Sequence, residues 1–179
     1  MVRAALGAGY LTMTGRIGIA EDEALIRLDL KETLEAEGYE VVGAVGRGDE
    51  AVELVKELHP DLAILDIKMP GMDGIAAARE ITASRRAAVL ILTAFSQRDL
   101  VEQARDAGAF YYLVKPFQTS DLVPAIEVAL GRFADMRAKE DEVEGITERL
   151  ENHRAVARAK RMPRDRDQMS GAAPPAPHT

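Results

Sequence analysis

The sequence contains no cysteine and no tryptophan, and aromatic residues make up only 4% of its 179 residues. The lack of cysteine excludes disulfides, thiolate zinc sites, iron–sulfur clusters and cysteine nucleophiles. The few aromatic residues argue against a stacking surface for nucleic-acid bases. Apolar runs are far shorter than the ~20 residues that cross a bilayer. We therefore expect a cytoplasmic protein that has no membrane partner.

The composition that remains, 47% hydrophobic and 30% charged residues, is typical of a globular protein that buries a core. The length suits one domain with an appendage. Residues 1–14 show no sustained periodicity, and we interpret them as a disordered leader. Acidic residues predominate up to residue 136, whereas basic residues gather near the end, at Arg154, Arg158, Lys160 and Arg161. This basic run fits either a contact with phosphates or a solvated surface.

Short apolar runs alternate five times with amphipathic stretches from residue 16 onward. The runs predict strands at 17–20, 40–45, 62–65, 89–92 and 110–114. The stretches predict helices at 24–37, 49–58, 75–83, 98–107 and from about 120, with Leu25, Leu28 and Leu34 on one face of the first. Apolar runs with little alternation suit parallel strands buried on both faces. The order predicts an α/β fold, a five-stranded parallel sheet doubly wound by helices.

Charged and hydroxyl side chains follow these predicted strands. Glu21 and Asp22 come after the first, Asp66 after the third, Thr93 after the fourth and Lys115 after the fifth. In a doubly wound sheet the ligand site lies outside the carboxyl ends of the strands, so these residues should converge. Singly, each also fits a structural role, such as capping a turn or ending a strand. Their occurrence at successive strand ends favours a shared site.

The chemistry of such a site follows from its residue types. Three converging carboxylates repel one another unless a cation intervenes. Oxygen ligands without histidine or cysteine favour Mg²⁺, or Mn²⁺, over zinc. A lysine ammonium and a threonine hydroxyl beside that metal would hold a transferred phosphoryl group. Asp66 then becomes the candidate nucleophile.

Four motifs carry a family resemblance: "IAEDE" (19–23), "LDIKMPGMDG" (65–74), "LTAFS" (92–96) and "LVKPF" (113–117). Residues 15–132 resemble the receiver domain of two-component response regulators. The resemblance implies a flavodoxin-like sandwich whose Asp66 accepts a phosphoryl group from the phosphohistidine of a sensor histidine kinase. It also implies no enzyme activity beyond self-catalysed phosphotransfer and dephosphorylation.

The resemblance assigns roles to single residues. Asp22, Asp66 and the backbone carbonyl of Lys68 would bind Mg²⁺, with Glu21 as the outer residue of the acidic pocket. Thr93 would bond the phosphoryl oxygen, Lys115 would pair with the aspartyl phosphate, and the peptide bond before Pro116 would be cis.

A conformational switch is also part of the resemblance. Tyr112 matches the aromatic residue that turns inward when Thr93 engages the phosphate. Two neighbouring aromatic residues compete for this assignment. Strand alternation places Phe110 and Tyr112 on one face and Tyr111 on the other, and we assign the switch to Tyr112.

Residues 133–162 continue a helical pattern beyond the receiver-like block. Apolar residues, with one histidine among them, recur three and four positions apart in two runs: Leu122, Ile126, Ala129, Phe133 and Met136, then Val143, Ile146, Leu150, His153 and Ala157. This spacing predicts a seam for a second helix, as in a coiled-coil homodimer or an intramolecular helical hairpin. A single long exposed helix is the alternative.

The segment "GRFADMRAKEDEVEGITERLENHRAVARAK" (131–160) resembles the linker and opening of an ANTAR-type output domain. Together with "LTAFSQRDLVEQARDAG" (92–108), it is most similar to actinobacterial receiver–ANTAR regulators. The resemblance implies transcription antitermination through nascent RNA, with Arg154, Arg158, Lys160 and Arg161 as candidate contacts to RNA or another partner. The competing hypotheses are a stand-alone receiver that dimerises on phosphorylation and, less favoured, a phosphatase that uses the acidic cluster.

The likeness to an ANTAR domain ends after Lys160. The remaining helices of the output domain are replaced by "RMPRDRDQMSGAAPPAPHT" (161–179). We expect residues 163–179 to form a disordered tail, because they are rich in alanine and proline. A shifted reading frame and a natural truncation would each explain the departure.

Overall fold

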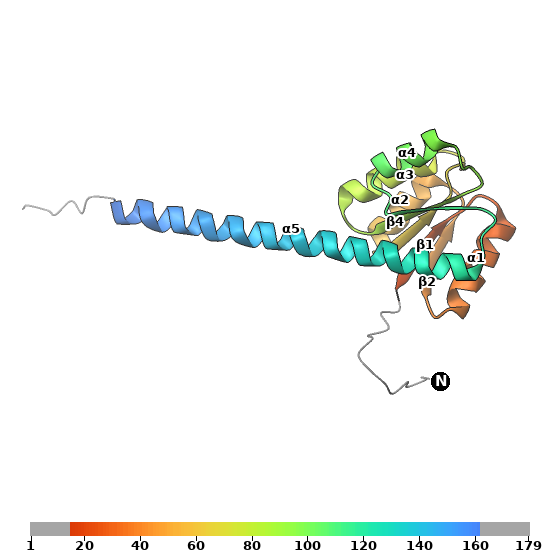
Figure 1. Ribbon diagram of the computed structural model, residues 1–179, viewed down its shortest axis with the longest axis horizontal. Coiled ribbons are helices and arrows are strands. Elements are labelled where there is room, and N and C mark those ends of the chain that lie inside the picture. Colours follow the sequence, from red (N-terminus) through yellow and green to blue (C-terminus); the bar gives the residue numbers. More distant parts are fainter. Residues whose placement is uncertain (1–14, 162–179) are drawn as a thin grey trace, which may run out of the picture. The chain divides into compact units, whose positions relative to one another are not determined.

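The computed structural model describes residues 15–161, in which five strands alternate with five helices (Figure 1). The strands are β1 (Arg16–Ala20), β2 (Glu40–Val45), β3 (Leu62–Leu65), β4 (Ala88–Thr93) and β5 (Tyr111–Val114). The helices are α1 (Ala24–Ala36), α2 (Gly48–Leu58), α3 (Gly74–Ser84), α4 (Arg98–Asp106) and α5 (Thr119–Arg161). The leader and tail assigned to 1–14 and 163–179 lie outside the described residues.

The five strands form one parallel sheet in the order β2-β1-β3-β4-β5. The chain moves outward from β1 to β2 and then crosses to β3 on the other side of β1. Strand order therefore reverses between β1 and β3, the place where doubly wound sheets bind ligands. Ala20 pairs with Leu65 in the register of these two strands, so the residues that follow them leave the sheet side by side. This architecture confirms the predicted fold class.

Each face of the sheet has its own apolar core. One core contains buried side chains from α2, α3 and α4, and the other contains side chains from α1 and the beginning of α5. Figure 1 shows α1 and the start of α5 on the face opposite α3 and α4. Every residue of β3 and β4 is buried. Helices on both faces explain why these runs lack polar alternation.

The predicted apolar face of α1 is wrong. Leu25 is 83% exposed and Leu28 is also exposed, whereas Leu30 and Leu34 are buried. The physical reason is helical geometry, because six residues turn a helix about 240° beyond a full turn. Leu28 and Leu34 therefore cannot share a face, while Leu30 and Leu34, four apart, do.

The predicted pairing of Phe110 with Tyr112 is also wrong. Phe110 packs in the same core as Tyr111, with its ring 5.8 Å from that of Phe133, whereas Tyr112 packs in the opposite core. Strand β5 begins at Tyr111, so Phe110 precedes the strand and does not follow its alternation. Tyr112 remains the aromatic side chain on the face of α4.

Helix α5 runs without interruption through 43 residues. Its residues up to Arg137 belong to the compact unit that contains the sheet, and residues from Ala138 belong to a second unit. We call residues 119–137 the anchor half and residues 138–161 the extension. An intramolecular hairpin is not formed within the described residues. None of the helices described in 15–161 is long and apolar enough to cross a membrane.

Candidate functional site

The strand ends bring together the side chains that the sequence singled out. Glu21 follows β1, Asp66 follows β3, Thr93 is the last residue of β4 and Lys115 follows β5. The backbone N–H of Asp66 donates to Ala20 at 2.9 Å, and that of Lys115 donates to Thr93 at 2.8 Å. These bonds extend the sheet pairing and fix where each side chain leaves the backbone.

Glu21, Asp22 and Asp66 form a carboxylate cluster in which one oxygen of each lies within 4.8 Å of the others. Glu21 is 1% exposed and Asp66 is 8% exposed, whereas Asp22 is exposed to solvent. By burial, Glu21 is thus the inner carboxylate of the pocket rather than the outer one. An all-oxygen donor set of this kind suits a hard divalent cation.

The ammonium of Lys115 bridges the two buried carboxylates. Its Nζ lies 2.5 Å from Glu21 Oε2 and 3.2 Å from Asp66 Oδ2. Burial raises the pKa of Glu21 against the opposing effect of this ammonium. Burial also lowers the pKa of Lys115, but its bond to Glu21 and the charge of Asp66 outweigh this, and the net pKa is raised. Lys115 therefore stays protonated and supplies a fixed positive charge beside Asp66.

Thr93 Oγ1 is the one buried side-chain oxygen or nitrogen in residues 15–161 that has no hydrogen-bond partner. Thr93 is fully buried at the end of β4. Buried hydroxyl groups are rarely left without a partner, and each exception calls for an explanation. An incoming oxygen-rich group beside Asp66 would accept this bond, so the orphaned hydroxyl fits a phosphoryl site.

Tyr112 and Lys68 both contact Phe95 in the loop after β4. The hydroxyl of Tyr112 donates to the backbone carbonyl of Phe95. Lys68 Nζ lies 4.2 Å from the centre of the Phe95 ring, a cation–π contact. Burial, with the charge of Asp66, raises the pKa of Tyr112, so the hydroxyl remains a donor. The side chain of Lys68 therefore contacts the loop after β4, whereas the group of Lys68 that was assigned to metal binding is its backbone carbonyl.

Three supporting contacts were not predicted from the sequence. The backbone N–H of Ile67 donates to Asp66 Oδ1 at 2.7 Å, and Arg27 Nη1 donates to the Glu21 carbonyl at 2.5 Å. At Gly74, an added Cβ would lie 1.8 Å from the Asp66 carbonyl oxygen. Only Gly74 had a signal in the sequence, since it ends the motif that contains Asp66. The peptide bond between Lys115 and Pro116 is cis, as the resemblance implied.

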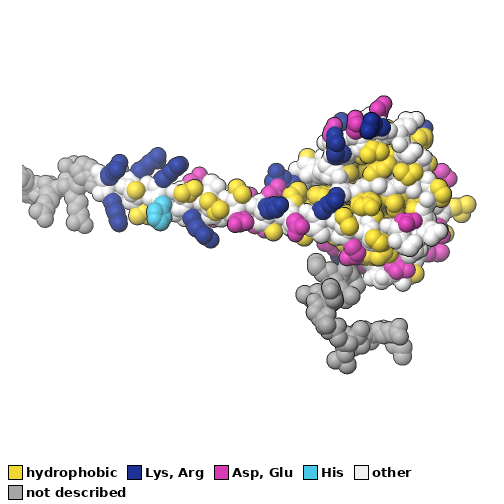
Figure 2. Space-filling model, in the orientation of Figure 1, with side chains coloured by type: hydrophobic (Ala, Val, Ile, Leu, Met, Phe, Trp, Pro, Cys, Tyr) yellow, Lys and Arg dark blue, Asp and Glu magenta, His cyan; other side chains and the backbone are white. Residues whose placement is uncertain are grey.

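The strongly basic positions lie on the extension. Arg154, Arg158, Lys160 and Arg161 are all exposed on the last turns of α5. In Figure 2, dark-blue side chains gather toward this end of the helix. They form a positively charged surface on the extension.

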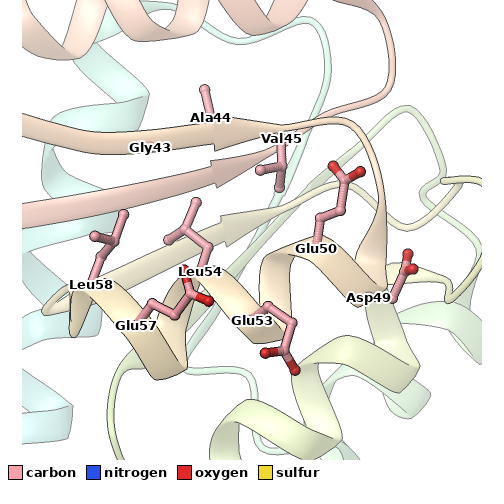
Figure 3. Close-up of a pocket in the computed structure, with 9 residues that line it drawn as sticks. All are labelled: Gly43, Ala44, Val45, Asp49, Glu50, Glu53, Leu54, Glu57 and Leu58. Atoms are coloured by element: carbon pink, nitrogen blue, oxygen red, sulfur yellow. The ribbon is translucent and has the colours of Figure 1, made fainter.

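A concave groove of about 470 Å³ lies between the edge strand β2 and α2. In Figure 3, Leu54 and Leu58 point from α2 toward β2, and the acidic residues Asp49, Glu50, Glu53 and Glu57 line the same groove from α2 and its start. A Cβ at Gly43 would lie 2.7 Å from Leu54 Cδ1, so these leucines already fill the floor. None of the residues at the carboxylate cluster lines this groove. An acidic rim alone identifies no ligand.

Comparison with known proteins agrees with this geometry. The chain matches the response regulator receiver domain family over residues 17–127. It is 61% identical over 145 residues to the transcriptional regulatory protein PdtaR of Mycobacterium tuberculosis, covering 81% of this chain and 71% of that protein. It is 43% identical to the chemotaxis protein CheY of Thermotoga maritima, covering 64% of this chain and 96% of CheY.

Solved structures add two relatives. The signal receiver domain of NarL from Mycobacterium tuberculosis superposes with a TM-score of 0.63 at 31% identity, covering 66% of this chain and 97% of that domain. A fusion that carries a trimeric coiled coil of yeast Spc42 gives a TM-score of 0.65 at 30% identity, covering 80% and 96%. The chain belongs to the response regulator receiver family.

Proposed function

We propose that this response regulator accepts a phosphoryl group on Asp66 from a sensor histidine kinase and thereby controls transcription. The observation that carries the proposal is the pairing of Asp66 with the Lys115 ammonium beside the orphaned hydroxyl of Thr93. A positive charge and an unused donor flank a carboxylate that is still reachable from solvent. This arrangement suits a group that brings several anionic oxygens.

In the proposed transfer, a carboxylate oxygen of Asp66 attacks the phosphorus of phosphohistidine. The new P–O bond forms as the P–N bond breaks, and the imidazole leaves with the electron pair. Lys115 and Thr93 hold phosphoryl oxygens, which is the electrostatic stabilisation that phosphoryl transfer needs. The N–H of Ile67 keeps the Asp66 carboxylate oriented through Oδ1. No separate substrate is turned over beyond this transfer and self-catalysed loss of the phosphoryl group.

The residues at the site also fit Mg²⁺, or Mn²⁺ as a replacement. Asp22, Asp66 and the backbone carbonyl of Lys68 would hold the cation, with Glu21 behind them. When bound, it supplies positive charge that offsets the carboxylates and the phosphoryl oxygens. The clustering of three carboxylate oxygens within 4.8 Å supports this assignment.

The switch that we propose uses the two hydroxyl groups near Phe95. Thr93 turns its free hydroxyl to a phosphoryl oxygen, and Tyr112 leaves the Phe95 carbonyl and turns inward. Phosphorylation then shifts a two-state equilibrium because only one state offers the phosphoryl group both contacts, Thr93 and Lys115. The surface that changes is formed by α4, β5 and the start of α5.

The phosphoacceptor is tested by treating the chain with acetyl phosphate and Mg²⁺ and measuring its intact mass. The native chain should gain one phosphoryl group, and D66N should gain none. D73N is the matched control, because Asp73 lies in the same loop and caps α3 by accepting from Ala76, a role that asparagine also fills. Removing the cation with a chelator should stop labelling. A labelled D66N would exclude Asp66.

For the output, we propose transcription antitermination through RNA. PdtaR, at 61% identity, is named a transcriptional regulatory protein, and the exposed basic turns of the extension supply a surface for phosphates. Binding of a short fluorescent RNA hairpin should fall as salt rises, and the quadruple variant R154A/R158A/K160A/R161A should abolish it. The control R79A/R98A removes two exposed arginines elsewhere. Binding that survives the quadruple variant would exclude this surface.

A second candidate function is phosphorylation-dependent homodimerisation without nucleic acid. It is favoured by the exposed apolar side chains of Val143, Ile146 and Leu150 on the extension. Light scattering on a sizing column, before and after acetyl phosphate with Mg²⁺, measures the mass directly. A doubling of mass in the native chain but not in D66N supports this output, and an unchanged mass contradicts it.

A further inference from the structure

The extension presents an apolar stripe that no described residue covers. Val143, Ile146 and Leu150 are 63%, 49% and 54% exposed. Their spacing of three and four residues puts them on one face of α5. In Figure 2, hydrophobic side chains run along this part of the helix. A stripe of this width is the seam by which two helices form a coiled coil.

A heptad frame places the neighbouring charges. With Val143, Leu150 and Ala157 at the a positions, Ile146 and His153 occupy d. Arg149 then lies at a g position and Arg154 at an e position. These flanking positions are where charged side chains of two paired helices meet, so they decide the orientation of the partner.

Charge is divided between the two ends of the extension. Residues 140–151 contain six acidic side chains and one basic one, and residues 152–161 contain four basic side chains and no acidic one. The helix dipole favours the basic side chains of the last turn, Arg158, Lys160 and Arg161, but it does not reach the acidic block in the middle of α5. The orientation of a second helix along the extension decides which of these charges would face each other.

We infer that the extension pairs with the extension of a second copy of this chain in antiparallel orientation. A parallel pair would lay acidic block on acidic block and would bring Arg149 beside the partner's Arg154 twice. An antiparallel pair instead lays residues 152–156 of each helix, which include Arg154, on residues 140–144 of the other, which hold four acidic side chains. Opposite charges in register favour one orientation, and like charges exclude the other.

One antiparallel register that pairs a with d positions is centred on residue 148. It stacks Ile146 on the partner's Leu150 and Val143 on the partner's His153. Glu140 then lies beside the partner's Arg154 in two symmetric contacts. One like-charge contact remains, between Arg149 and the partner's Arg149. Two attractive contacts against one repulsive contact still favour this orientation over the parallel one. Lys160 and Arg161 lie beyond the paired length.

This inference specifies the homodimer of the second candidate function and rests on it, but not on RNA binding. Because the native chain has no cysteine, single cysteines report the orientation without background. V143C and H153C are prepared separately, one carrying an affinity tag, then mixed and mildly oxidised. An antiparallel pair gives the mixed disulfide at least about tenfold above either variant alone, since these positions face each other. E148C, on the outer face, is the matched collision control.

Each other result overturns the inference in a recognisable way. Disulfides formed by V143C alone and by H153C alone would show a parallel dimer. A dimer mass without these disulfides would place the contact on another surface. A monomer mass before and after acetyl phosphate with Mg²⁺ would remove the homodimer itself. If that monomer binds RNA, the basic residues of the extension serve RNA binding and not dimerisation.

Reversing the charge of one residue tests the orientation independently, because the two orientations predict opposite changes in dimer affinity. R154E should weaken an antiparallel dimer by about tenfold, because the new carboxylate faces the partner's Glu140, and E140R/R154E should restore it. In a parallel dimer, R154E would instead relieve the contact with Arg149 and tighten association. The dissociation constant from sedimentation equilibrium, with R158E as the control at an outer position, distinguishes the two.

Discussion

The two halves of α5 carry the same apolar spacing in different surroundings. In the anchor half, Leu122, Ile126 and Ala129 are fully buried against the sheet. In the extension, Val143, Ile146 and Leu150 stay about half exposed or more. The comparison teaches that spacing determines which side chains share a helical face, whereas burial depends on whether another apolar surface lies opposite.

The sharpest test of this comparison uses the same substitution in both halves. I126A should lower the free energy of unfolding by about 2–5 kcal/mol, because it leaves a cavity in a packed core. I146A should change it by less than about 0.5 kcal/mol at concentrations where the chain is monomeric. Urea unfolding of both variants measures the difference. Equal losses would show that the extension is also packed against the receiver unit.

The anchor half is also held by a partly buried hydrogen bond from the Tyr39 hydroxyl to the Glu127 carboxylate, 2.6 Å between oxygens. Burial, with the bond to Glu127, raises the pKa of Tyr39 well above its usual value. Y39F should therefore lower stability by about 1–3 kcal/mol at neutral pH. A raised pKa means a contribution that is complete below about pH 10, the unfolded value, and is lost as the pH rises toward the folded value.

The check is urea unfolding of the native chain and Y39F from neutral to alkaline pH. The difference in free energy of unfolding between the native chain and Y39F should become smaller above about pH 10. A difference that is constant across this range would mean that the Tyr39 hydroxyl has the same pKa in the folded and the unfolded chain, which would contradict its raised pKa.

Two glycines offer a finer comparison, one in each half of α5. Gly131 and Gly145 both have open space where a Cβ would be added. G131A should raise the free energy of unfolding of the receiver unit by about 0.5–1 kcal/mol, because alanine loses less backbone entropy in a helix. G145A should raise helix content by circular dichroism without changing that unfolding. If both variants stabilise the receiver unit equally, the anchor half and the extension unfold as one cooperative unit.

The smallest expected effect contrasts the bonded hydroxyl of Tyr39 with the unpartnered hydroxyl of Thr93. T93V should leave stability unchanged or raise it by up to about 1 kcal/mol, because the lost group has no partner in residues 15–161. Phosphorylation should still label T93V but should no longer change its conformation. Thermal unfolding and a near-ultraviolet spectrum with acetyl phosphate measure the two readouts. A strongly destabilised T93V would mean that the hydroxyl is bonded in solution.

Much of the fold was predictable from particular residues. The predicted bounds of β2 and β3 match the structure because turn residues flank these short apolar runs. The face of α1 and the side taken by Phe110 were not predicted correctly, since both depend on small shifts of phase within an element. At the site, the residue types at the strand ends predicted which side chains meet. The inner position of Glu21 and the contacts from Ile67 and Arg27 depend on loop conformations that no spacing specifies.

The sequence by itself determined the order of elements, the convergence of Glu21, Asp66, Thr93 and Lys115, and the division of charge along the extension. These follow from periodicity and from the rule that parallel strands end at one edge of a sheet. Only the tertiary structure decided that Lys115 bridges two carboxylates, that the Thr93 hydroxyl has no partner, and that one half of α5 is buried. Such facts require side chains from distant segments to meet, and their distances are set by packing, which no local pattern encodes.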